Sequence, residues 1–351
     1  MEEVPEVLAG RWRLVRRIGR GGMGVVFQVV DDRTKRRCAM KVLSRGDGNL
    51  VERFRREASA LVRIRSEHVV RVIEADILHE HGGRPYMVME HLRGRDVAQW
   101  LGERTRFTPR ETLTILVQAA RGVACAHEQG IVHRDLKPEN LFLHEEVDGR
   151  RVVKVVDFGL ANDKGLSRIT LTGEALGTPL YMSPEQVCGT AVSVRTDVWA
   201  FGVIACEMLS GRPYFDLKNV PQILTAIARG PIVPPSRRWL HLPPAFDAWF
   251  FRSCAVDPAQ RFASVIDQMD ALAEALALRV IAVPITQPAP PRWAGIASLA
   301  AGATLALVGL VVCAEPRAPA PPRAAAIVVS ATASAEPPPA PLPVTVVGVT
   351  R

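Results

Sequence analysis

The sequence predicts a two-lobed α+β domain, in which a small antiparallel sheet precedes a mainly helical lobe, followed by one C-terminal transmembrane helix. Short alternating apolar segments fill the region between Trp12 and His91, as is typical of strands. Longer helical patterns dominate after Gly94. From Ile281 onward Pro, Ala and Val prevail, and this change in composition marks a domain boundary.

Composition excludes several classes of protein. The 351 residues are 48% hydrophobic and 23% charged, which is too apolar for a disordered chain. A net charge of +8 suits phosphate-rich ligands or an anionic surface without deciding between them. Six scattered cysteines without a C-x-x-C pair argue against disulfides and zinc sites. The N-terminus lacks the basic and apolar regions of a cleaved signal peptide, so the first domain is expected in the cytoplasm.

The first lobe is expected to contain one helix inserted in the sheet. The predicted strands are Leu14–Ile18, Val25–Asp31, Arg37–Leu43, Val69–Leu78 and Pro85–His91. The helix spans Val51–Ile64, with an apolar face that includes Phe54 and Leu61 and with arginines opposite. Those arginines lack interleaved aromatic residues, so a solvated helix face is favoured over a nucleic-acid site and no nucleic-acid partner is expected.

The second lobe is expected to be built on two long helices. These are Leu113–Gln129 and Val194–Ser210. Between them lie the short strands Asn140–His144 and Val152–Val156, which an Asp148-Gly149 turn joins as a hairpin.

A glycine-rich segment, Gly19–Val26, has the pattern G-x-G-x-x-G-x-V and lies between two predicted strands. Glycines allow a tight turn and let backbone N–H groups approach phosphate oxygens that a side chain would keep away. A dinucleotide-binding crossover would need a helix next, whereas Val25–Asp31 has a strand pattern. The pattern alone leaves open a glycine-rich hairpin without a ligand.

Lys41 ends an apolar strand soon after this loop. A solvated surface lysine is the ordinary alternative, but the alternation of the strand favours an inward side chain. An inward cation requires anions, and the candidates are a nucleotide phosphate and the carboxylate of Glu57 on the following helix.

Three further motifs follow in order: HRDLKPEN at 133–140, DFG at 157–159 and SPE at 183–185. With them, the sequence resembles a bacterial eukaryotic-type (Hanks-type) serine/threonine protein kinase of the membrane-anchored branch. The resemblance covers residues 12–276. It implies the bilobal protein-kinase fold, with an antiparallel-sheet N-lobe at 12–92 and a mainly helical C-lobe at 93–276.

The resemblance assigns catalytic and metal-binding roles. Asp135 would orient the substrate hydroxyl and accept its proton, and Lys137 would stabilise charge near the γ-phosphate. Asn140 and Asp157 would hold Mg²⁺, with Mn²⁺ as an alternative ion.

The resemblance also implies how ATP is bound. Lys41, paired with Glu57, would hold the α- and β-phosphates, while Met89 is the gatekeeper and Glu90–Leu92 the hinge that meets adenine. Apolar side chains would cover the adenine ring on both sides. The implied nucleotide-binding residues are Ile18, Gly19, Arg20, Gly21, Gly22, Met23, Gly24, Val25, Val26, Ala39, Lys41, Glu57, Met89, Glu90, Leu92 and Phe142.

Other positions match the family's structural and regulatory features. Leu61, His133 and Phe158 match three members of its regulatory stack of side chains, with Leu78 as the candidate fourth. Ordinary packing in the hydrophobic core is the alternative role of these side chains.

Two structural polar contacts are also implied by the resemblance. Asp197 would brace the catalytic loop, and Arg261 would pair with Glu185. Lys137 and Thr178 stand at positions that mark serine/threonine specificity in the family.

Regulation is expected in the segment between the DFG and SPE motifs. Thr170 and Thr172 match activating phosphothreonines of related bacterial kinases, and Arg134 is suited to pairing with a phosphate. Autophosphorylation is the hypothesis, and two solvated loop threonines are the alternative.

The segment 294–314 contains no charged residue and has the length that spans a bilayer. A buried core helix is the alternative, but the flanking Pro-rich segments offer no domain to pack against. Arginines flank it equally on both sides, so charge does not set its orientation. An ATP-dependent domain must face the cytoplasm, which predicts a single-pass protein of the inner membrane. Residues 277–293 would then form a juxtamembrane linker, and 315–351 a disordered extracytoplasmic tail.

Small residues recur every four positions in this segment, at Ser298, Gly302 and Ala306. Such a row permits close helix approach and allows a homodimer, although an Ala-rich helix without this role would look the same.

The predicted function is transfer of the γ-phosphate of Mg-ATP to Ser or Thr hydroxyls of protein substrates, the kinase itself included, in membrane-associated signalling. A catalytically silent pseudokinase that acts as a membrane scaffold is the main alternative. A small-molecule phosphotransferase is the second.

Overall fold

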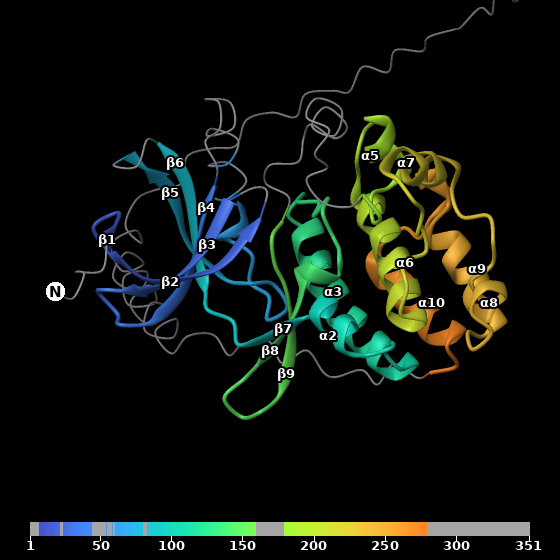
Figure 1. Ribbon diagram of the computed structural model, residues 1–351, viewed down its shortest axis with the longest axis horizontal. Coiled ribbons are helices and arrows are strands. Elements are labelled where there is room, and N and C mark those ends of the chain that lie inside the picture. Colours follow the sequence, from blue (N-terminus) through green and yellow to red (C-terminus); the bar gives the residue numbers. More distant parts are fainter. Residues whose placement is uncertain are drawn as a thin grey trace, which may run out of the picture. The chain divides into compact units, whose positions relative to one another are not determined.

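The computed structural model describes residues 7–21, 24–43, 54, 58, 60–79, 83–158 and 179–278. Figure 1 shows the strands of the N-lobe gathered apart from the helices of the C-lobe. The N-lobe sheet is antiparallel throughout, in the order β1-β2-β3-β4-β6-β5. Its strands are β1 Val7–Leu8, β2 Trp12–Gly21, β3 Gly24–Asp31, β4 Arg37–Leu43, β5 Val72–Leu78 and β6 Arg84–Glu90.

The glycine-rich segment connects two paired strands. Gly21 of β2 lies opposite Gly24 of β3, and Gly19 lies opposite Val26. A strand therefore follows the loop, which confirms the hairpin and excludes the dinucleotide-binding crossover. Gly24 is required here because a Cβ at this position would collide with the backbone carbonyl of Val42 on β4.

The two faces of the sheet carry separate apolar clusters. Along β4, Cys38, Met40 and Val42 belong to an outer cluster, whereas Ala39 and Leu43 belong to the main core. This period of two places Lys41 on the inner face, as its sequence context predicts.

Leu78 is not the fourth member of the regulatory stack, because it packs in the outer cluster. The pairing of β5 with β6 shifts register between Val72 and Glu74, so that Val72 pairs with Met89 while Leu78 pairs with Arg84. A bulge reverses the alternation of side chains after it. Val72 therefore faces the inner core in the place that Leu78 was expected to take.

The helix expected at Val51–Ile64 is described only in part. Phe54, Ala58 and Leu61 are helical and buried, as the apolar face predicts. The chain forms a turn directly after Leu61, so the helix ends earlier than expected.

The C-lobe is built around α6, most of whose residues are buried. The helices are α2 Val97–Glu103, α3 Pro109–His127, α5 Pro184–Cys188, α6 Val194–Ser210, α7 Val220–Arg229, α8 Pro235–Arg238, α9 Pro244–Ser253 and α10 Val265–Ala275, with 3₁₀ turns at Pro138–Asn140 and Pro258–Gln260. Ser193 caps the N-terminus of α6, and Gly211 with φ of +76° ends it.

A second sheet joins the two lobes. It consists of β7 Gly94–Asp96, β8 Leu141–Glu145 and β9 Arg151–Val155, in that order. The β8–β9 hairpin confirms the predicted pair of strands, with each boundary displaced by about one residue. Figure 1 shows this hairpin extending beyond the helices beside it.

The transmembrane segment expected at 294–314 lies outside the described residues, as do the linker from 279 onward and the tail. In the described part of the chain, no helix combines the length and apolar character needed to cross a bilayer.

The Glu185–Arg261 pair yields a stability prediction. The two terminal guanidinium nitrogens, Nη1 and Nη2 of Arg261, each donate to the Glu185 carboxylate at 2.8 Å, and the Arg261 side chain is fully buried. Replacing Arg261 with Ala leaves a buried carboxylate without its cation, so we expect a loss of about 3–5 kcal/mol in the free energy of unfolding. Urea denaturation measures this difference.

The matched control is Arg95→Ala, which breaks the exposed pair with Glu103. We expect a change below about 1 kcal/mol for this variant. An equal change in the free energy of unfolding in the two variants would show that the buried pair stabilises the fold no more than the exposed pair does.

Candidate active site

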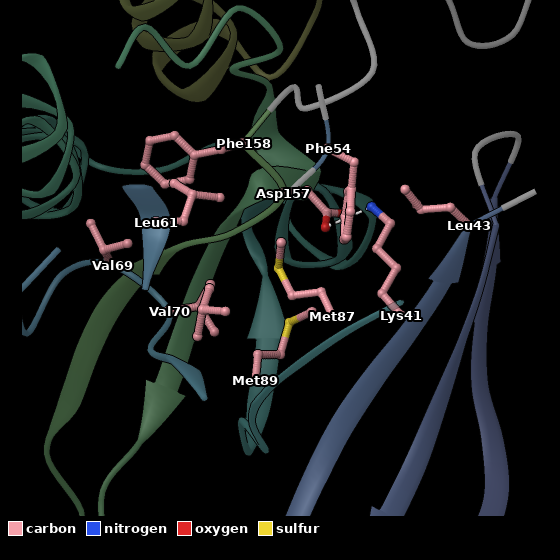
Figure 2. A pocket seen from close by; sticks show the side chains of 11 residues that line it. Lys41, Leu43, Phe54, Leu61, Val69, Val70, Met87, Met89, Asp157 and Phe158 are labelled. Atoms are coloured by element: carbon pink, nitrogen blue, oxygen red, sulfur yellow. Dashed lines mark hydrogen bonds and ion pairs between the residues drawn. The ribbon is translucent and has the colours of Figure 1, made fainter. Parts of the chain in front are cut away.

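Lys41 and Asp157 bring the two lobes together at one ion pair. The Lys41 Nζ lies 2.7 Å from Oδ1 of Asp157, and Figure 2 shows the two side chains pointing toward each other. Lys41 comes from the inner face of β4, and Asp157 follows β9 with a left-handed φ of +55°. Glu57, the expected partner of Lys41, lies outside the described residues.

A largely apolar pocket adjoins this ion pair. Phe54, Met89 and Phe158 line it together with Lys41 and Asp157. In Figure 2 the Phe54 ring lies beside the ion pair, whereas the Phe158 ring is turned toward Leu61 and Val69. The remaining lining residues are Leu43, Val70, Val72 and Met87. Apolar walls exclude water and strengthen electrostatic interactions near the charged pair.

The segment 133–140, which we call the catalytic loop, holds its polar groups close together. Lys137 Nζ donates to Oδ2 of Asp135 at 2.9 Å, and the Asn140 side-chain nitrogen donates to the Asp135 backbone carbonyl at 2.6 Å. Asn140 is buried at the end of the 3₁₀ turn that precedes β8, and its backbone carbonyl accepts from the N–H of Val156. These bonds fix Asp135 and Asn140 at the end of the strands that also position Asp157.

Asp197 on α6 binds backbone groups of this loop. Its Oδ2 accepts from the His133 N–H at 2.9 Å and contacts Nε2 of His127 at 2.7 Å, while its Oδ1 accepts from the Arg134 N–H at 3.0 Å. The Asp197 side chain is only 1% exposed. The bracing role that the resemblance implied for Asp197 therefore has a direct geometric basis.

Arg134 has a left-handed backbone, with φ of +66°. A non-glycine residue in this region is uncommon and persists where its surroundings impose it. Asp197 binds its N–H, and the Gln186 side chain from α5 donates to its carbonyl at 2.7 Å. The peptide groups on both sides of Arg134 are thus held by hydrogen bonds. These bonds fix the backbone orientation of the next residue, Asp135.

His133 is fully buried and neutral. Its Nε2 faces the Val156 carbonyl at 3.0 Å, and its Nδ1 faces the Asp135 N–H at 3.3 Å. Nε2 must therefore carry the hydrogen and Nδ1 must accept. Burial lowers the pKa of His133, and a second proton would also place two donors face to face. The ring centroid lies 4.5 Å from that of Phe158, which continues the stack toward Leu61 and Val72.

The expected hinge is held by a charged pair. The Glu90 carboxylate accepts from Lys154 Nζ at 3.0 Å and from the Arg71 N–H at 2.8 Å. The Glu90 N–H already donates to the Arg71 carbonyl, so adenine would have to meet other backbone groups of the hinge. Leu92 is half-buried and packs against the main core.

The residues expected above and below the adenine ring come from three strands. Val26 on β3 lies opposite Lys41, and Ala39 on β4 lies opposite Met89, the expected gatekeeper. Phe142 is half-buried on β8. Ile18 and Arg20 are exposed at the end of β2, while Val25 is half-buried on β3.

Several predicted site residues lie outside the described part of the chain. They are Gly22, Met23, Glu57, Gly159, Thr170, Thr172 and Thr178.

The donor set suits a hard divalent cation. Asp157 offers carboxylate oxygens, and Asn140 turns its side-chain nitrogen to the Asp135 carbonyl, which leaves its side-chain oxygen as a ligand. Among the described residues no cluster of three or more His, Cys, Asp or Glu side chains could hold a metal alone. Two protein ligands completed by nucleotide phosphates and waters form the arrangement that Mg²⁺ favours.

Sequence reasoning missed three residues that shape the site. Phe54 was assigned only to an apolar helix face, yet it lines the pocket beside the ion pair. His127 and Gln186 bind Asp197 and the Arg134 carbonyl through contacts that no local motif announces. Lone polar residues on helices give no signal until the partner segment is known.

Comparison with known proteins places this geometry in a family. Residues 12–272 match the family model described as "Protein kinase domain". The chain is 38% identical over 279 residues to the serine/threonine-protein kinase Pkn1 of Myxococcus xanthus, which covers 78% of this chain and 39% of Pkn1. It is 34% identical over 284 residues to PknL of Mycobacterium tuberculosis, covering 79% of this chain and 69% of PknL.

Solved structures agree with these matches. The crystal structure of the Mycobacterium tuberculosis PknI kinase domain is similar with a TM-score of 0.62 at 27% identity, covering 78% of this chain and all of that one. The chain spans about two fifths of Pkn1, so the larger relatives contain regions without a counterpart in this match.

The neutral state of His133 predicts a pH dependence of stability. Its folded pKa lies below the unfolded value of about 6.5, so the unfolded chain takes up the proton first as the pH falls. The stabilising contribution is complete above pH ~6.5 and is lost progressively below it. We expect the decline in unfolding free energy between pH 7.5 and 5.5 to be shallower in His133→Phe, as measured by urea denaturation.

His79→Gln, at an exposed position, serves as the control and should keep the wild-type slope. Burial also lowers the pKa values of His68 and His91, which account for a residual slope in the variant. An unchanged slope in His133→Phe would contradict a neutral, buried ring.

Proposed function

This chain belongs to the protein kinase family, and we propose that it is a serine/threonine kinase that transfers the γ-phosphate of ATP to protein hydroxyls, its own included. The observation that carries the proposal is the arrangement of Asp135, Lys137 and Asn140 in one braced loop, with Asp157 against Lys41. Relatives named as serine/threonine kinases support the choice of hydroxyl acceptors.

Each of these side chains has a chemical task in phosphoryl transfer. Asp135 orients the attacking hydroxyl and accepts its proton as the hydroxyl oxygen bonds to phosphorus and the bond to the β-phosphate oxygen breaks. Lys137 donates to the Asp135 carboxylate at 2.9 Å, and its ammonium group would stabilise negative charge on the transferred group. Lys41 binds the non-transferred phosphates, and the apolar pocket keeps water away.

The metal is proposed to be Mg²⁺, held by Asn140 and Asp157. When bound, it neutralises phosphate charge during transfer. Both residues present oxygen atoms, and hard oxygen ligands favour Mg²⁺ with Mn²⁺ as a substitute.

The pseudokinase alternative is disfavoured by the side chains present. Lys41, Asp135, Asn140 and Asp157 are all retained, and a silent scaffold has no need to hold them in one geometry. The small-molecule phosphotransferase is disfavoured by the SPE motif, whose Glu185 is built into the C-lobe core.

Membrane anchoring is part of the proposal and rests on the sequence. The uncharged segment 294–314 is long enough to span, and dependence on ATP would place the kinase domain on the cytoplasmic side of the inner membrane. The Ser298, Gly302 and Ala306 row would favour a homodimer in which one copy phosphorylates the other. Thr170 and Thr172 are the proposed targets.

Labelled phosphate transfer from Mg-ATP tests the catalytic proposal. We expect the full chain to label itself and a generic protein substrate, whereas Asp135→Asn falls by at least about 10²-fold because the general base is lost. Mapping should locate the label on Thr170 or Thr172. Asp267→Asn, a change at an exposed position in the first turn of α10, should keep wild-type activity.

Absence of label in a folded chain that binds ATP would favour the scaffold. Label retained by Asp135→Asn would remove Asp135 from its role.

The membrane proposal predicts that the full chain sediments with membranes and resists carbonate extraction. Replacing Leu305 and Leu307 with Arg introduces charges near the middle of the segment, each costing about 2.5–3.5 kcal/mol, and should release the protein. Arginines introduced with the same spacing at Ala324 and Ala326, in the tail, should leave it bound. Extraction of the wild-type chain by carbonate would refute anchoring.

A further inference from the structure

An open groove lies on the C-lobe beside α7, apart from the pocket next to Lys41. It has a cavity volume of about 740 Å³ and is bounded by the segment after α6, by α7 and by the segment between α7 and α8. Its apolar lining includes Leu217, Ile232 and Val233, and its charged lining includes Asp216, Arg229 and Arg238. We call it the α7 groove.

The apolar residues of the α7 groove are unusually exposed. Ile232 is 76% exposed, and Leu217 and Val233 are each 44% exposed. Grouped exposed apolar side chains with a polar rim are typical of a binding surface, whereas single ones need no explanation.

The backbone of the segment between α7 and α8, which carries Ile232 and Val233, is restrained by several contacts. The Tyr214 hydroxyl donates to the Val233 carbonyl at 2.7 Å and accepts from the Val233 N–H at 3.1 Å. Gly230 ends α7 with φ of +78°, where a Cβ would press against Val256. Prolines at 231 and 234 further restrict the backbone of this segment.

The charged lining of the groove is mainly cationic. Arg229 and Arg238 are exposed, and in the described part of the chain neither is paired with a carboxylate. Lys218 and Arg237, each next to a lining residue in the sequence, are also exposed. Asp216 is the single acidic residue that lines the groove among those described. The local charge is therefore suited to an acidic partner.

Arg238 is pre-oriented for such a partner. Its guanidinium lies 4.8 Å from the ring centroids of both Tyr214 and Trp239, and one nitrogen donates to the Tyr214 carbonyl. A stacked guanidinium loses little freedom when its remaining N–H groups bind a carboxylate.

The groove is also connected to the catalytic loop. The helix α7 packs against α5, and Gln186 of α5 binds the Arg134 carbonyl one residue before Asp135. Figure 1 shows α5 and α7 adjacent. A segment held in the groove would thus contact α7, which packs against the helix that supports the loop where hydroxyl groups would react.

We propose that the α7 groove docks an acidic segment with interspersed Leu or Ile side chains from protein substrates, away from the residue that is phosphorylated. This deepens the proposed function and rests on it. The Leu or Ile side chains of the substrate segment would pack against Leu217, Ile232 and Val233. Its carboxylates would pair with Arg229 and Arg238. Docking of this kind raises the effective concentration of the acceptor near Asp135 without new contacts at the catalytic loop.

Fluorescence anisotropy with the full chain, in the absence of ATP, tests the proposal. The probe is a fluorescein-labelled peptide of about twelve residues in which Glu or Asp alternates with Leu or Ile. We expect it to bind, and we expect Arg229→Glu and Ile232→Asp each to weaken binding by at least about tenfold. The control variants Arg110→Glu and Val147→Asp, exposed on α3 and on the β8–β9 hairpin, should bind as the wild type does.

Two further peptides make the test specific. Replacing the acidic residues of the probe with Lys, or its apolar residues with Ser, should abolish binding. Equal binding of the Lys peptide, or equal binding by the groove and control variants, would overturn the proposal. Self-association of the chain that Ile232→Asp abolishes, with no peptide bound, would assign the groove to a second copy and would also overturn it.

Phosphate transfer to a generic protein substrate, measured in the same preparations, separates this proposal from the proposed function. Intact peptide binding without transfer would contradict the kinase activity alone. Intact transfer without peptide binding would contradict the docking groove alone.

Discussion

The carboxylate of Asp197 lies at the centre of the catalytic machinery, because donors from two separate segments converge on it. The N–H groups of His133 and Arg134 come from the catalytic loop, and the ring of His127 comes from the end of α3. A buried carboxylate without these donors would be severely destabilised. The hydrogen bonds to Asp197 therefore stabilise a single conformation of the loop, in which Arg134 has a left-handed backbone.

The fixed conformation of the catalytic loop determines which groups the N-lobe contacts. With the loop fixed, Asn140 lies directly before β8 and Asp157 lies shortly after β9, and Lys41 approaches Asp157 from the inner face of β4. The two charges that would serve phosphate and metal stabilise each other at 2.7 Å. The site is thus assembled from the braced loop and strands of one lobe and one strand of the other, joined by a close ion pair.

Buried polar contacts also fix the position of α5 in the C-lobe. Glu185 and Arg261 fix α5 to the core through a buried pair, and Gln186 reaches from that helix to the catalytic loop. The α7 groove lies beside α7, and α7 packs against α5, so a partner bound in the groove would lie one helix away from the support of the catalytic loop. Its exposed apolar side chains add little to the core, which leaves them available to a partner.

The lobes, the glycine-rich hairpin and the inward side chain of Lys41 could be predicted from the sequence, because they depend on local periodicity and short motifs. The catalytic loop was identified through the resemblance of its contiguous motif to that of protein kinases. Tertiary structure decided the rest. A bulge in β5 moved Leu78 to the outer cluster and put Val72 in the inner core, which alternation by itself could not foresee. His127 and Phe54 acquired their roles only through partners that lie far away in the chain, because a side chain's contacts across space leave no trace in its immediate neighbours.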